Sequence, residues 1–138
     1  EDSNKADAAI VEILNKSETD LVVLAGYMKK IGDQTLKAYQ GRILNIHPAL
    51  LPKFGGRGMF GKRVHEAVLK SGDSVTGVTI HLIDEKYDNG PILAQEEVAV
   101  LENDTADSLA ERVLVKEHTL YAETIAKIIS KEIRLPII

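Results

Sequence analysis

The chain has 138 residues, 44% of them hydrophobic and 28% charged, a balance typical of one globular domain and not of a disordered chain or a coiled coil. Its net charge of -4 provides no basic surplus for binding a nucleic acid, and the absence of cysteine excludes disulfide bonds and thiolate metal sites. No apolar run approaches the roughly 20 residues of a membrane span, so we expect a single cytoplasmic domain over residues 1–138 with no membrane partner.

The first half of the chain alternates helical and strand patterns. Apolar residues spaced three and four apart predict a surface helix over residues 6–14 that covers a sheet. The continuous apolar run 21–26 predicts a strand buried on both faces. A short helix over residues 33–39 leads to a second strand that ends at Pro48, so this half predicts a parallel unit with a helical crossover.

A glycine-rich loop over residues 55–61 follows the second strand. It lacks the Gly-Lys-Ser/Thr of a phosphate-binding loop and does not join a strand to a helix in the dinucleotide pattern, which favours a flexible lid or a plain turn. Helical spacing resumes over residues 63–70, with Gly72 as the expected C-cap.

Two later segments, 75–83 and 92–100, alternate as strands do, and a turn signature at residues 88–91 lies between them. We expect an antiparallel pair at the edge of the sheet. A long helix then begins at Asp104 or Thr105.

The long helix carries an apolar stripe through Leu109, Val113 and Leu120. Glu111 and Glu117 fall between the turns of that stripe, on a face expected to be solvated. The tail 133–138 is expected to add one short strand.

Asn45 and His47 are polar residues within the second predicted strand. Because side chains alternate between the faces of a strand, both point to the same side, and Pro48 places them at its carboxyl end. Ligands of open parallel sheets bind at that end. The alternative is that Asn45 caps a turn and that His47 is a structural histidine.

A histidine that carries charge near neutral pH is usually tuned by a carboxylate. Asp88 is the best candidate, because the turn at Asn89-Gly90 can swing its carboxylate inward; the alternative is that it only forms a turn with its own backbone. The chain has no serine elbow, no cysteine nucleophile and no zinc-like histidine spacing. An amide, an imidazole and a carboxylate therefore favour direct transfer between bound substrates through a tetrahedral intermediate.

The run Asn45-Ile46-His47-Pro48-Ala49-Leu50-Leu51-Pro52 resembles the phosphoribosylglycinamide formyltransferases, of the superfamily that uses formyltetrahydrofolate, as do residues 24–28, 77–81 and 88–91. The resemblance implies transfer of a formyl group from 10-formyltetrahydrofolate to the amine of glycinamide ribonucleotide in purine synthesis. It also implies a Rossmann-like α/β fold, with a mostly parallel sheet flanked by helices.

Relative to that family, the chain lacks the N-terminal strands and the loop that grips the substrate phosphate. We therefore expect residues 1–138 to be the C-terminal catalytic and folate-binding portion, with an unpaired sheet edge and poor turnover by itself. The implied partners are two small molecules, glycinamide ribonucleotide and folate, with no metal, and the protein is expected to be a monomer or a homodimer.

The resemblance implies a role for each candidate residue. His47 matches the catalytic acid and base, Asn45 the amide that binds the formyl oxygen, and Asp88 the carboxylate that keeps the histidine charged. The residues implied in folate binding are Met28, Lys29, Lys30, Ile31, Ile43 and Asn45. The family usually has arginine in place of Lys29, so a planar two-pronged contact there is in question.

Two other functions remain open. One is a formyltetrahydrofolate deformylase or another formyltransferase of the superfamily, although deformylases tend to have a second histidine where this chain has Pro48. The other is a non-catalytic fragment that contributes only to assembly.

Overall fold

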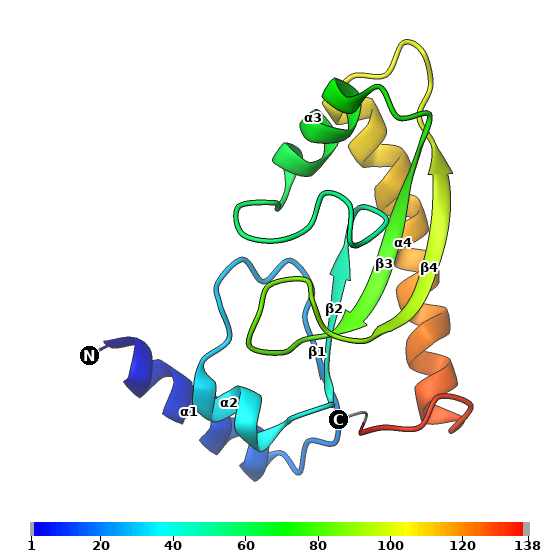
Figure 1. Ribbon diagram of the computed structural model, residues 1–138. Coiled ribbons are helices and arrows are strands. Elements are labelled where there is room, and N and C mark those ends of the chain that lie inside the picture. Colours follow the sequence, from blue (N-terminus) through cyan, green and yellow to red (C-terminus); the bar gives the residue numbers. More distant parts are fainter. Residues whose placement is uncertain (1, 137–138) are drawn as a thin grey trace.

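A four-stranded sheet lies at the centre of the computed structural model, which describes residues 2–136 (Figure 1). In chain order the elements are α1 (Asp2–Lys16), β1 (Val22–Val23), α2 (Asp33–Ala38), β2 (Ile43–His47), α3 (Lys62–Ser71), β3 (Val75–Leu82), β4 (Ile92–Ala99) and α4 (Ala106–Ile129). The strands lie side by side in the order β1-β2-β3-β4. The expected α/β architecture is confirmed.

The sheet is mixed, and the expectation that it is mostly parallel is wrong for residues 2–136. β1 runs parallel to β2, because α2 carries the chain back between them, whereas β2 with β3 and β3 with β4 are antiparallel. α3 lies beyond the carboxyl end of β2, so β3 starts at that end and runs back beside β2 (Figure 1). The antiparallel pair predicted from residues 75–83 and 92–100 is confirmed.

β1 is shorter and more open than the sequence predicts. Of the run 21–26, only Val22 and Val23 pair with β2, and Val23 is 38% exposed. The expected burial on both faces is therefore wrong. Among residues 2–136, β1 has a strand neighbour on one side only, so the expected unpaired edge is present.

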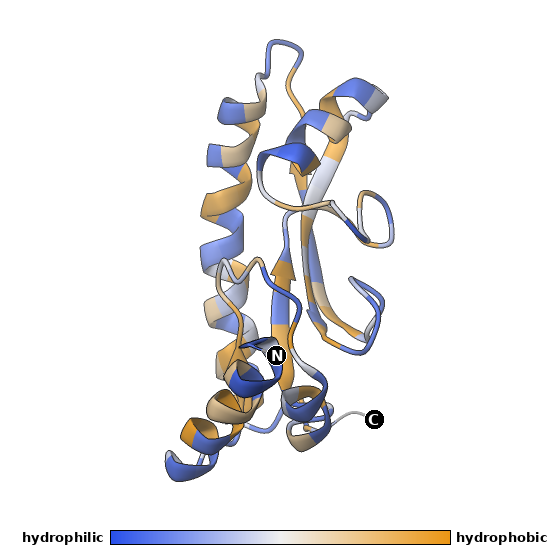
Figure 2. Ribbon diagram, turned by 90° about the vertical axis from the view of Figure 1, so that its left-hand side faces the viewer, coloured by the Kyte–Doolittle hydropathy of each residue, from blue (hydrophilic) through white to orange (hydrophobic). Residues whose placement is uncertain are grey.

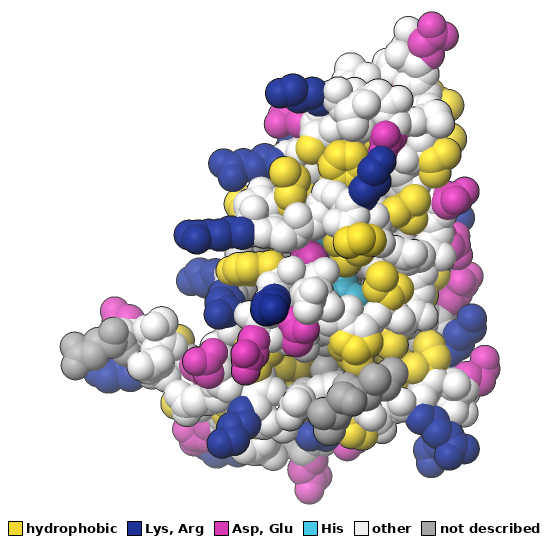
Figure 3. All heavy atoms as spheres, in the orientation of Figure 1, with side chains coloured by type: hydrophobic (Ala, Val, Ile, Leu, Met, Phe, Trp, Pro, Cys, Tyr) yellow, Lys and Arg dark blue, Asp and Glu magenta, His cyan; other side chains and the backbone are white. Residues whose placement is uncertain are grey.

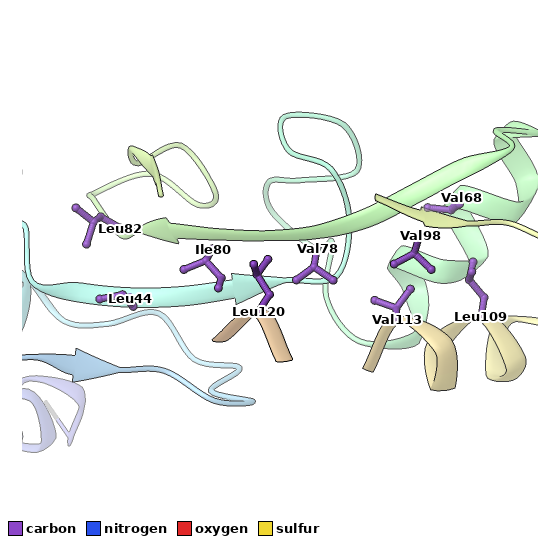
Figure 4. Close-up of a cluster of buried hydrophobic side chains, with 9 residues drawn as sticks. All are labelled: Leu44, Val68, Val78, Ile80, Leu82, Val98, Leu109, Val113 and Leu120. Carbon is purple, nitrogen blue, oxygen red and sulfur yellow. The ribbon is translucent and has the colours of Figure 1, made fainter. Parts of the chain in front are cut away.

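The hydrophobic core lies between one face of the sheet and the helices α3 and α4 (Figure 4). Its buried side chains are Leu44, Val68, Val78, Ile80, Leu82, Val98, Leu109, Val113 and Leu120. Figure 2 shows apolar residues along the strands and at intervals along α4. The predicted stripe of the long helix is confirmed, and its N-cap is Thr105, whose side chain accepts a hydrogen bond from the Ser108 N–H.

α1 packs mainly against α2, and it reaches the sheet only near its end, where Leu14 packs against the cluster that contains Ile43 of β2 (Figure 1). Its apolar stripe is partly open, and Ile13 is 63% exposed. The residue that α1 buries is instead an acid, Asp7. Sequence periodicity predicts this helix but not its main packing partner, α2.

Asp7 caps the N-terminus of α2 from a different helix. Its carboxylate accepts hydrogen bonds from the backbone N–H groups of Gln34, at 2.8 Å, and Thr35, at 3.1 Å, and from the Thr35 hydroxyl. The N-cap residue itself, Gly32, offers no side chain, and a Cβ there would lie 2.2 Å from Asp7 Cγ. Asp7 therefore holds both α2 and the end of the loop that precedes it.

Replacing Asp7 with alanine should lower the free energy of unfolding by about 1–2 kcal/mol, the usual cost of losing an N-cap. Burial acts to raise the pKa of Asp7, but the hydrogen bonds from Thr35 and Gln34 outweigh it and the pKa lies below its usual value. The stabilisation is therefore complete above about pH 4 and is lost as the pH falls through the lowered pKa. Urea unfolding at several pH values should show that the difference in the free energy of unfolding between wild type and Asp7→Ala becomes smaller in acid.

The control for this experiment is Asp2→Ala, which removes an exposed acid from the same helix. If the difference in the free energy of unfolding between wild type and Asp7→Ala stays constant from neutral to strongly acid pH, the carboxylate does not act as the cap.

Residues 133–136 form no strand, and residues 137–138 of the predicted final strand lie outside the described residues. Over residues 2–136, the structure has no helix of the length and apolar character that a membrane crossing requires.

Candidate active site

The sheet has a polar face opposite the core, which carries Asn45, His47 and Thr79. The segment that follows β2 folds over this face. Thr79 on β3 fixes that segment: its hydroxyl donates to the Ala49 carbonyl at 2.7 Å and accepts from the Leu51 N–H at 3.0 Å. Gly77 permits the close approach, because a Cβ there would lie 2.4 Å from Leu50 Cδ2. The loop after β2 is thereby brought against the sheet.

The structure brings Asn45, His47 and Asp88 together. The two β2 residues share the polar face, as strand alternation predicts, and His47 is buried. The Asp88 carboxylate lies 3.7 Å from His47 Nδ1 through Oδ2, and 3.6 Å from Nε2 of a second buried histidine, His81, through Oδ1. The Asn45 amide nitrogen is 3.3 Å from the same His81 nitrogen.

Asp88 turns its carboxylate inward, as the sequence predicts. The residue has a positive φ of 54°, and its side chain is 10% exposed. The Gly56 N–H donates to Oδ2 at 2.8 Å, so the glycine-rich loop contacts the site. The turn that was the alternative for Asp88 is made by Asp84 instead, which accepts from the Lys86 N–H at 2.7 Å.

His47 has a defined hydrogen-bond partner on one ring nitrogen. Nε2 lies 2.7 Å from the carbonyl oxygen of Phe54, which can only accept, so Nε2 carries a proton and donates it. The other nitrogen, Nδ1, faces Asp88 at a distance longer than a hydrogen bond. Nδ1 is therefore the ring nitrogen left for a ligand.

Two hollows meet at this cluster. The wide hollow, of about 870 Å³, lies among the loops after β1 and β2 and the start of α4; the narrow hollow, of about 80 Å³, lies beneath the loop before β4. Both are lined by Asn45, Asp88, Tyr27, Lys29 and Tyr87, and His47 lines the wide one. Figure 3 shows a histidine near the middle of this face, among apolar and acidic side chains.

The predicted folate-binding residues divide between the hollows. Met28 lines the wide hollow, Lys30 and Ile31 line the narrow one, and Lys29 lines both. Ile43 does not line either hollow in the described part of the chain: it is 1% exposed and packs in a core cluster with Ile31. The prediction that Ile43 lines the site is not supported, because α2 and its flanking residues cover the start of β2.

Residues of α4 and β3 also line the hollows, although the sequence does not predict them there. Helical spacing places Glu111 and Glu117 on a solvated face of α4, but both line the wide hollow, and burial raises the pKa of Glu117. His81 lies opposite Asn45 in the β2–β3 pairing and lines the narrow hollow. The register of the pairing is the signal that locates His81, and the sequence does not supply it.

The structure agrees with the formyltransferase resemblance of the sequence. It has an amide, an imidazole and a carboxylate close together where two hollows meet. The chain belongs to the formyl transferase family, whose sequence profile matches residues 1–125.

Within that family its relatives include the chloroplastic phosphoribosylglycinamide formyltransferase of Arabidopsis thaliana, 51% identical over 91% of this chain and 43% of that protein. The phosphoribosylglycinamide formyltransferase of Bacillus subtilis is 41% identical over 91% of this chain and 63% of its own length. The crystal structure of the Bacillus halodurans enzyme of that name superposes with a TM-score of 0.83 at 43% identity, over 96% of this chain and 66% of that one. The chain thus spans less than two thirds of each.

Proposed function

We propose that the protein transfers a formyl group from 10-formyltetrahydrofolate to the amine of glycinamide ribonucleotide, in purine synthesis. The observation that carries the proposal is the Asp88 carboxylate beside His47 Nδ1, at the point where the two hollows meet. The names of the relatives in Arabidopsis thaliana and Bacillus subtilis support it.

The reaction forms one carbon–nitrogen bond and breaks another. The acceptor amine attacks the formyl carbon, and the formyl oxygen gains negative charge in a tetrahedral intermediate. An N–H of Asn45 and a proton on His47 Nδ1 can donate to this oxygen, because both groups line the wide hollow. The bond from the carbon to N10 of the folate then breaks.

Proton transfer completes the balance, since the acceptor nitrogen loses one proton and N10 gains one. His47 is suited to carry this proton, because Nε2 stays bound to Phe54 while Nδ1 exchanges. Asp88 places a carboxylate 3.7 Å from Nδ1, where its negative charge attracts the positive charge that the ring has while it carries this proton.

The walls of the hollows suit two different substrates. Tyr27 and Tyr87, which are 40% and 50% exposed, offer aromatic faces to a conjugated ring such as that of folate. The wide hollow lies in the size range of small-molecule sites and has an acid, Glu117, on its wall. We assign the folate ring to the side of the narrow hollow and the amine acceptor to the wide one.

Glu117→Gln should raise the KM for the amine acceptor about tenfold while changing kcat less, because we assign this carboxylate on the wall of the wide hollow to binding of the acceptor and not to the proton transfer. Steady-state kinetics with each substrate varied in turn would measure this. Glu123→Gln, an exposed acid on the same helix, is the control. An unchanged KM for the acceptor, or a rise confined to the folate KM, would contradict the assignment.

The proposed function is tested by assaying the complete product of the gene that encodes this chain. Formylated glycinamide ribonucleotide should appear together with tetrahydrofolate. Release of formate without the acceptor would instead identify a deformylase, and a folded protein that does neither and does not respond to a folate analogue would identify an assembly fragment. The cytoplasmic location stays a prediction, as does the monomeric or dimeric state.

A further inference from the structure

His81 is a buried histidine that the mechanism above does not use. It is 1% exposed, and it lies directly opposite Asn45 in the β2–β3 pairing. Its ring contacts groups on three sides: the Leu82 carbonyl oxygen at 3.1 Å from Nδ1, and Asn45 Nδ2 and Asp88 Oδ1 at 3.3 Å and 3.6 Å from Nε2.

These contacts determine which ring nitrogen holds the proton. A carbonyl oxygen can only accept, so Nδ1 carries the hydrogen and donates it to Leu82. In a neutral ring Nε2 is then an acceptor. A carboxylate has no proton to donate, whereas the Asn45 amide has two, so Asn45 donates one N–H to His81 Nε2.

The environment of His81 favours the neutral ring. Burial lowers the pKa of His81, and the charge of His47 lowers it further. The Leu82 carbonyl and the carboxylates of Asp88 and Asp84 act in the opposite direction, but the pKa remains below its usual value.

The backbone around His81 holds the Leu82 carbonyl that accepts the Nδ1 proton. The β3–β4 pairing is irregular between Ile80 and His81, where Ala94 and Ile92 are their partners and Leu93 is the extra residue. Gly90 lets the loop between β3 and β4 pack against Leu82, because a Cβ at this position would lie 1.8 Å from the Leu82 carbonyl oxygen. The acceptor of the Nδ1 proton is therefore held in place by the same loop that carries Asp88.

We propose that His81 is a positioning residue, whose neutral ring accepts one N–H of Asn45 and so directs the other N–H toward the formyl oxygen. The inference rests on the proposed function, because it concerns the amide that would bind that oxygen. A charged ring would reverse the contact. Nε2 would become a donor, and the Asn45 amide would have to turn its oxygen toward the ring and its N–H groups away.

The kinetic test compares two substitutions in the complete gene product. His81→Leu removes the acceptor and should lower kcat by about 10²-fold, with a smaller change in either KM, because a misplaced group costs rate more than binding. His81→Gln retains an acceptor oxygen about as far along the side chain as Nε2, so its kcat should be at least tenfold higher than that of His81→Leu. His118→Leu, which changes an exposed histidine of α4, should leave the rate unchanged.

A second measurement does not depend on activity. Nitrogen NMR of the histidine rings in the wild-type protein should show His81 protonated at Nδ1 and unprotonated at Nε2 at neutral pH. The hydrogen bond to His81 should displace the NMR chemical shift of one side-chain N–H of Asn45. This displacement should persist in His81→Gln and disappear in His81→Leu.

The outcomes separate the two proposals. An active wild type with a proton on His81 Nε2, or with a folded His81→Leu of full rate, would overturn the positioning role and leave the proposed function intact. A folded wild type without formyl transfer would overturn the proposed function itself. If His81→Leu does not fold, the NMR signals and the rate of His81→Gln decide, and a loss in His81→Gln as large as 10²-fold would count against the inference.

Discussion

Replacing His47 with glutamine should lower kcat for formyl transfer by about 10²–10⁴-fold, the range for loss of a general acid and base. Glutamine can still donate a hydrogen bond to the Phe54 carbonyl in place of Nε2, so the loop after β2 should stay in position. It has no counterpart of Nδ1, the nitrogen that faces Asp88 and the wide hollow. Steady-state kinetics and thermal unfolding of the same preparation would test this result.

The control for His47 is His118→Gln, an exposed change on α4 that should leave both the rate and the unfolding temperature unaltered. A folded His47→Gln enzyme with the wild-type rate would exclude His47 from the chemistry.

Replacing Asp88 with asparagine should lower kcat by about 10²-fold or more, because it removes the negative charge that lies beside both buried histidines. Asparagine can still accept from the Gly56 N–H through its amide oxygen, but this hydrogen bond is weaker than one to a carboxylate, so the glycine-rich loop should become more mobile. The loss should appear in kcat with a smaller change in either KM, because the charge lies beside the reacting cluster. Steady-state kinetics with each substrate varied in turn would measure this.

Asp20→Asn, at an exposed position away from both hollows, provides the control for Asp88. A rise in KM with an unchanged kcat would show that Asp88 acts only by holding the loop. Amide hydrogen exchange at residues 55–61 would distinguish loosening of that loop from the change in charge.

The sequence predicts those parts of the site that follow from local rules. Asn45 and His47 are found because side chains two apart in a strand share a face. Asp88 is found because an Asn-Gly turn permits the backbone that swings its carboxylate inward, and the structure has that backbone with a positive φ of 54° at Asp88 itself.

The parts that were missed depend on distant contacts. His81 belongs to the site through the register of β2 and β3, which no local pattern specifies. Glu117 was missed because helical spacing separates apolar from polar faces but does not distinguish open solvent from a hollow. The antiparallel pairing of β2 with β3 was missed for a similar reason, since the direction of β3 depends on which end of β2 the α3 helix lies beyond.

The contact that Asp7 makes with α2 also links two distant parts of the molecule. The capped residues, Gln34 and Thr35, come soon after Lys29, Lys30 and Ile31, which line the narrow hollow. A ligand that immobilises this segment would therefore strengthen the attachment of α1, and by reciprocity any factor that secures α1 would raise the affinity for that ligand. The N-terminal helix is in this way an energetic partner of the binding site, although it contributes no side chain to the lining of either hollow in the described chain.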